Sequence, residues 1–60
     1  MTRVLVVDDN GLLAELLREA LEDEGYCVRT AAGVAEASAA IRERWPDVLL
    51  LDAHLPGVDA

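Results

Sequence analysis

Two short runs of the chain are apolar at every position. One covers residues 4–7 and reads Val-Leu-Val-Val, and the other covers residues 48–51 and reads Val-Leu-Leu-Leu. A continuous apolar run of this length, ended by polar turn residues, is typical of a strand that is buried on both faces. We therefore predict strands at residues 4–7 and 48–51, in a parallel sheet with helices on each side.

Two other regions repeat their apolar residues with the period of a helix. The first predicts a helix near residues 11–24, with Gly25 directly after its C-cap. The second follows Gly33, an acceptable N-cap, and Pro46 cannot continue it, so Trp45 is expected at its apolar end. The two stripes consist of Leu13, Leu16, Leu17, Ala20 and Leu21, and of Val34, Ala37, Ser38, Ile41 and Trp45.

The segment between these helices predicts a third, short strand. Residues 26–30 alternate partly between apolar and polar, which favours an edge strand with one wetter face. Residues 31–33, Ala-Ala-Gly, form the expected turn, and Cys27 is expected to fill a small place in the core.

The elements alternate as βαβαβ. Strands separated by helices of this length pair in parallel through right-handed crossovers. Helices on both faces then give the strand order 2-1-3, with the first strand in the centre. The predicted fold class is therefore α/β, with no internal repeat or linker.

Composition narrows the classes of function. The chain of 60 residues has five arginines, no lysine and 12 acidic residues, a net charge of −7. This balance excludes a basic footprint for nucleic acid and a polybasic membrane anchor. A hydrophobic content of 53% excludes a disordered acidic tail.

Location is predicted from two further features of the sequence. A single cysteine cannot close an intrachain disulfide and fits a reducing compartment. No apolar run approaches the roughly 20 residues of a membrane span. We expect a cytoplasmic protein without membrane contact.

Three aspartates follow the two buried strands. Asp8 and Asp9 close the first strand, and Asp52 closes the last. Because parallel strands end at one edge of the sheet, these residues should meet where open α/β sheets bind ligands. Neighbouring strand residues point to opposite faces, so all three converge only if Asp9 already lies on the loop.

Clustered carboxylates repel one another and need a cation or protonation to coexist. Mg²⁺ is the abundant hard cation for such oxygen ligands. A carboxylate beside it can attack a phosphoryl group and form an acyl phosphate. The alternative interpretation is that these aspartates only end strands and begin helices.

Two segments carry a family resemblance: Val4-Leu5-Val6-Val7-Asp8-Asp9-Asn10, and the segment from Leu49 through Asp52-Ala53-His54-Leu55-Pro56-Gly57 to Asp59. Together they resemble the receiver domain of two-component response regulators. The resemblance implies a flavodoxin-like fold. It implies that Asp52 accepts a phosphoryl group from a sensor histidine kinase or a phosphotransfer protein. It also implies a Mg²⁺ site made by Asp8, Asp9, Asp52 and the backbone carbonyl of His54.

The resemblance covers only part of a receiver domain. The family has five βα units, and these 60 residues match the first half, through the third strand and its acceptor loop. The family's Ser or Thr after strand 4 and its Lys after strand 5 have no counterpart here, and Ala60 stands where a glycine is usual. We expect residues 1–60 to be an incomplete receiver domain, not an enzyme, that does not hold a stable phosphoryl group alone.

The residues disfavour two enzyme functions and leave one other function open. A phosphatase with an Asp nucleophile usually has a second acid two residues later, where this chain has His54. A dinucleotide-binding enzyme needs a glycine-rich turn after the first strand, which is absent. A third possibility is an interaction fragment without chemistry, which self-associates as a homodimer or pairs through the exposed edge of its last strand.

Overall fold

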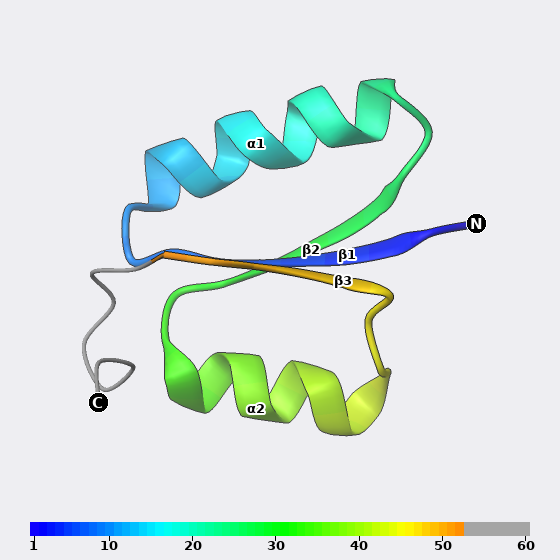
Figure 1. Ribbon diagram of the computed structural model, residues 1–60. Helices are drawn as coiled ribbons and strands as arrows, with labels where there is room; N and C mark the ends of the chain where they lie inside the picture. Colours follow the sequence, from blue (N-terminus) through cyan, green and yellow to red (C-terminus); the bar gives the residue numbers. More distant parts are fainter. Residues whose placement is uncertain (53–60) are drawn as a thin grey trace.

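A computed structural model gives the arrangement of the chain and describes residues 1–52. Three strands form one sheet, with α1 on one face and α2 on the other, so the described part has three layers (Figure 1). The elements are β1 (Arg3–Val7), α1 (Gly11–Asp23), β2 (Cys27–Ala31), α2 (Val34–Glu43) and β3 (Val48–Leu51).

The sheet has the predicted topology. Its strand order is β2-β1-β3, and β1 pairs in parallel with both neighbours. Val4 lies opposite Val28 on one side and Val48 on the other. The prediction of an α/β fold with a central first strand is therefore confirmed.

The core has two halves because the side chains of β1 alternate between the faces of the sheet. Val4 and Val6 pack with Ala14 of α1, and Leu17 and Leu21 join them. On the other face, the cluster contains Leu5, Val7, Ala31, Ala37 and Ala40, with Ile41 against it. The continuous apolar run of β1 thus packs against α1 on one face and α2 on the other, as predicted.

The ends of the helices follow the local sequence. Asn10 caps α1 because its side-chain oxygen accepts a hydrogen bond from the Leu13 N–H at 3.1 Å. Gly25 takes a positive φ of 95° just after the C-cap, where a residue with a Cβ is strained. Gly33 is the N-cap of α2, as predicted.

One arginine joins the exposed acidic residues of α1. The Arg18 guanidinium pairs with Glu15 and, at 2.7 Å, with Glu22. Hydrogen bonds to Glu15 first, and then to Glu22, raise the pKa of Arg18, so it stays charged. Both pairs have helical i,i+3 or i,i+4 spacing.

Three details of the sequence prediction are wrong. Strand β2 begins one residue later than expected and includes Ala31, which is buried in the core and not in the turn. Cys27 is exposed and does not fill the core. Trp45 lies beyond the end of α2 and is 77% exposed, because Arg44 already leaves the helix with an extended backbone.

The apolar stripe of α1 is only partly covered. Ala14 is buried, with Leu17 and Leu21 packed beside it, whereas Leu13 and Leu16 are exposed. The helical period is correct, but the buried face is displaced from the predicted stripe. Ala20, which the stripe included, is exposed, and Ala14, which it did not include, is the buried residue of the helix. A helix packs only the side that meets the sheet, and here that sheet ends at β3.

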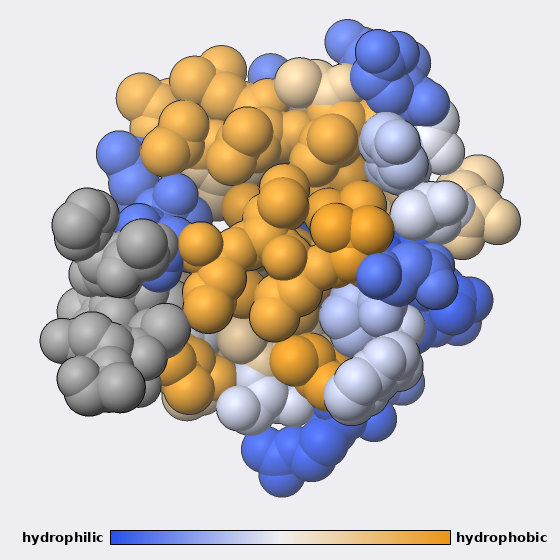
Figure 2. All heavy atoms as spheres, in the orientation of Figure 1, coloured by the Kyte–Doolittle hydropathy of each residue, from blue (hydrophilic) through white to orange (hydrophobic). Residues whose placement is uncertain are grey.

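In the part of the chain that the structure describes, strand β3 is an exposed edge. Its four apolar residues are between 39% and 48% exposed. Figure 2 shows apolar side chains gathered over this side of the molecule, from α1 across β3 to α2. The prediction of an apolar edge at the last strand is confirmed. Within residues 1–52, no helix is long and apolar enough to cross a membrane.

Candidate functional site

The hydrogen bonds of the sheet bring Asp8 and Asp52 together. Val7 and Leu51 are the last partners in the register of β1 and β3, so the residues after them are neighbours. The Asp52 N–H donates to the Val7 carbonyl at 3.0 Å, and the Asp8 N–H donates to the Ala31 carbonyl at 3.0 Å. The ladder therefore fixes both aspartate backbones at the carboxyl edge of the sheet.

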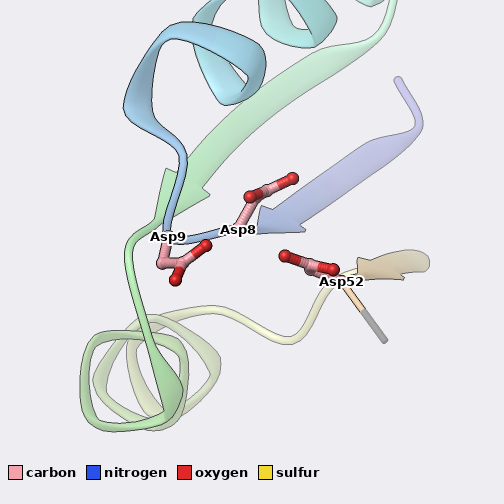
Figure 3. A group of neighbouring side chains, drawn as sticks. All are labelled: Asp8, Asp9 and Asp52. Atoms are coloured by element: carbon pink, nitrogen blue, oxygen red, sulfur yellow. The ribbon is translucent and has the colours of Figure 1, made fainter. Parts of the chain in front are cut away.

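Asp9 completes the group from the loop between β1 and α1. It lies two residues beyond the end of β1 at Val7. Its side chain is therefore not bound by the alternation between sheet faces that would direct it away from Asp8. One carboxylate oxygen from each of Asp8, Asp9 and Asp52 lies within 4.8 Å of the other two. Figure 3 shows the three side chains around a common space. The predicted convergence is confirmed.

The three aspartates differ in their surroundings. Asp8 is 8% exposed, Asp52 is partly buried and Asp9 is exposed. An Asp8 carboxylate oxygen accepts a hydrogen bond from the Asn10 N–H at 2.9 Å. The same Asn10 caps α1, so one short turn fixes both the helix and the buried carboxylate.

Sequence reasoning placed the start of α1 correctly but did not assign Asn10 a role. The signal was present, because an Asn immediately before a helical stripe is a standard N-cap. Asn10 is a positioning residue here, since it holds the turn that carries Asp8 and Asp9.

A hollow leads along β3 to the site. It has a volume of about 240 Å³ and is lined by apolar side chains of β1, α1 and β3, and by Asp8 and Asp52 at one end. Apolar walls beside charged groups strengthen electrostatic interactions at the site, since fewer waters screen them. Asp8 and Asp52 are thus reachable without being fully surrounded by water.

The donor set fits a hard divalent cation. All three groups are carboxylates, which are the oxygen ligands that Mg²⁺ and Ca²⁺ prefer, and no nitrogen or sulfur donor belongs to the described cluster. A cation also offsets the repulsion between three converging negative charges. The His54 carbonyl, the fourth ligand expected from the sequence, lies outside the described residues.

The comparison with protein families settles the origin of this arrangement. The family model described as the response regulator receiver domain matches residues 4–59. The chain belongs to this family. The match includes both strands that carry the aspartates, so the recognition of a receiver domain from the sequence is confirmed.

Curated relatives have the same origin. The chain is 44% identical over 57 residues to the DNA-binding response regulator MtrA of Mycobacterium tuberculosis. This match covers 95% of this chain and 25% of MtrA. The chain is 42% identical over 59 residues to the virulence transcriptional regulatory protein PhoP of Salmonella typhimurium, covering 98% of the chain and 26% of PhoP.

A solved structure agrees in fold. The non-phosphorylated receiver domain of HemR from Leptospira biflexa superposes with a TM-score of 0.84 at 37% sequence identity. The match covers 95% of this chain and 46% of that receiver domain. The chain therefore spans about a quarter of the curated relatives and just under half of a solved receiver domain.

Proposed function

We propose that Asp52 is the phosphoryl acceptor of a phosphorelay receiver module. The observation that carries the proposal is the convergence of Asp8, Asp9 and Asp52 within 4.8 Å at the carboxyl edge of a receiver-type sheet. Asp8 and Asp52 both line the end of the apolar hollow. Asp8 is 8% exposed and accepts the Asn10 N–H, whereas Asp52 is less buried and is the more accessible of the two to an incoming phosphoryl group.

In this proposal, the partner is a sensor histidine kinase or a phosphotransfer protein. A carboxylate oxygen of Asp52 attacks the phosphorus of a phosphohistidine, the new P–O bond forms, and the P–N bond breaks. The imidazole leaves with the electron pair of that bond and takes up a proton. The product is an acyl phosphate on Asp52.

Asp8, Asp9, Asp52 and the His54 backbone carbonyl are the proposed ligands of Mg²⁺. When bound, the ion supplies positive charge that neutralises the phosphoryl oxygens. Asp8 is held by the Asn10 N–H and Asp9 by the same turn, so both carboxylates stay directed at the site. These residues position charge, and Asp52 alone forms a covalent bond.

We further propose that residues 1–60 are the first half of a receiver domain, that the module is not an enzyme and that it works in the cytoplasm. The 60 residues contain no lysine to neutralise a phosphoryl group. The acyl phosphate on this chain is therefore expected to be short-lived. Nucleic acid is not a direct partner of this acidic segment.

Chemical trapping tests the acceptor. The 60-residue chain is incubated with Mg²⁺ and a small phosphoramidate donor, and borohydride is added, which reduces an acyl phosphate but leaves a free carboxylate unchanged. Peptide mapping should then find the reduced residue at position 52. An Asp52→Asn variant should give no trapped product. Trapping at another aspartate, or none in the unmodified chain, would contradict the proposal.

A second candidate function rests on a separate observation. All four residues of β3 are exposed and apolar, and an unprotected edge of this kind pairs with other strands. Under this candidate, the chain is an interaction module that forms a homodimer or pairs with another partner through β3, without chemistry at Asp52. The trapping experiment separates the two, since only the first forms an acyl phosphate.

A further inference from the structure

A second cavity lies at the opposite end of the sheet from the aspartates. It has a volume of about 50 Å³ and is lined by the start of β1 and β2, the end of α2 and the segment that follows α2. No residue of β3 and none of the three aspartates lines it. The cavity is thus separate from both the candidate site and the exposed edge.

Three of the five arginines of this acidic chain line the cavity. They come from three elements: Arg3 from β1, Arg29 from β2 and Arg44 from the C-cap of α2. Arg3 and Arg29 occupy the same strand faces as Leu5 and Ala31, which pack against α2. The strand register and the end of α2 therefore bring distant arginines to one place.

The charge of these arginines is only partly compensated. Arg29 pairs with Glu43 at 3.6 Å, and both side chains are well exposed. Within residues 1–52, the guanidinium groups of Arg3 and Arg44 make no ion pair. Asp47 is nearby but accepts its hydrogen bond from the Arg3 backbone N–H, at 2.8 Å.

The lining as a whole, with the three arginines included, is mostly apolar. Leu5, Ala40 and Pro46 contribute to it, and the cavity has room for a few waters or a short alkyl chain. Guanidinium groups pair with carboxylates in planar, two-pronged geometry, and their charge favours anions. The combination fits a ligand with one anionic end and a short apolar tail.

We propose that this cavity binds a small organic monocarboxylate, with the carboxylate among Arg3, Arg29 and Arg44 and the alkyl tail against Leu5, Ala40 and Pro46. This site is independent of phosphoryl transfer at Asp52. Such a ligand would join the start of the sheet to the end of α2, and its affinity should be about millimolar, given its few atoms.

The only thiol of the chain reports on occupancy. Cys27 is exposed and lines the cavity, so a bound ligand should shield it from reagents. The rate of Cys27 labelling by a small neutral maleimide is measured on the 60-residue chain, with and without hexanoate at constant ionic strength. Saturating hexanoate should slow labelling about tenfold at ten times its dissociation constant.

Three additives separate charge from apolar contact. Hexanoate should protect Cys27, whereas inorganic phosphate, which lacks the tail, and hexanol, which lacks the charge, should not. Equal protection by phosphate or by hexanol would overturn the proposal, because one half of the lining would then be irrelevant. Labelling that hexanoate does not change would also overturn it.

Variants test the arginines. Arg44→Gln and Arg3→Gln should each weaken protection at least about fivefold, since each removes a charged hydrogen-bond donor. Arg42→Gln is the matched control: it lies on the same helix but does not line the cavity. Loss of protection in the Arg42 variant, or its retention in both of the others, would contradict the assignment. Helical circular dichroism should remain the same in all three variants.

Discussion

Strands β1 and β3 have almost the same sequence pattern and opposite surroundings. Each contains four consecutive apolar residues followed by an aspartate. The apolar residues of β1 are between 1% and 4% exposed, and those of β3 are between 39% and 48% exposed. The difference arises from position in the sheet, because within residues 1–52 β1 has a strand on each side and β3 has one only.

The comparison shows that an apolar run predicts a strand but not how much of that strand is buried. The run at residues 48–51 has the composition of a buried central strand, yet the described residues cover it on one side only. Its aspartate is nevertheless in place, since one neighbouring strand is enough to set the register of Asp52 against Asp8. Packing around β3 and assembly of the acidic cluster are therefore separable.

The largest expected effect is at the centre of the sheet. Val6→Ala removes two methyl groups from a side chain that is 1% exposed and packed with α1. We expect a loss of about 2 kcal/mol in the free energy of unfolding. Urea unfolding followed by circular dichroism measures it, since Trp45 is too exposed to be a good fluorescent probe. A loss below about 0.5 kcal/mol would mean that β1 is not the core strand.

A smaller loss is expected at the turn that follows β1. Asn10→Ala removes the N-cap of α1 and should cost about 1 kcal/mol. Asn10→Ser keeps an oxygen acceptor without adding a fourth carboxylate and is the matched control, expected to retain most of the stability. The same urea experiment applies, and equal losses in both variants would show that the cap hydrogen bond is not the cause.

The corresponding change in β3 should cost less than in β1. Val48→Ala removes the same two methyl groups from a residue that is 41% exposed. We expect a loss below about 1 kcal/mol, because much of this side chain is already in water. A loss equal to that of Val6→Ala would show that β3 is covered in solution, by a second copy or another segment.

The smallest expected effect on stability is from a charge on the edge. Leu49→Lys should change the free energy of unfolding by no more than about 0.5 kcal/mol. It should, however, abolish any concentration-dependent association, because lysine protects edge strands from pairing. Sedimentation at several protein concentrations distinguishes the cases, and association that survives the substitution would exclude β3 as the interface.

The sequence predicted most of the fold for physical reasons that are local. Continuous apolar runs identified β1 and β3, and Gly25 and Gly33 marked helix ends by their backbone requirements. The convergence of Asp8, Asp9 and Asp52 was also predictable, since parallel topology alone places strand ends together. The roles of these residues, and that of His54, came from resemblance and stay predictions.

The errors concern burial, which depends on distant neighbours. Cys27 and Trp45 are apolar enough for a core, but no described element covers them. The cavity lined by Arg3, Arg29 and Arg44 gave no sequence signal at all, because its residues are far apart along the chain and carry no motif. Only the register of the strands and the end of α2 bring them together.

The most direct test of the acidic cluster is the effect of Mg²⁺ on unfolding. At ten times its dissociation constant, Mg²⁺ should stabilise the chain by about 1.4 kcal/mol and move the urea midpoint upward. Asp23→Asn, at the end of α1 and outside the cluster, should behave in the same way, whereas Asp9→Asn and Asp52→Asn should lose the shift. A midpoint that Mg²⁺ leaves unchanged, or raises equally in all variants, would contradict the assignment of a cation site to these aspartates.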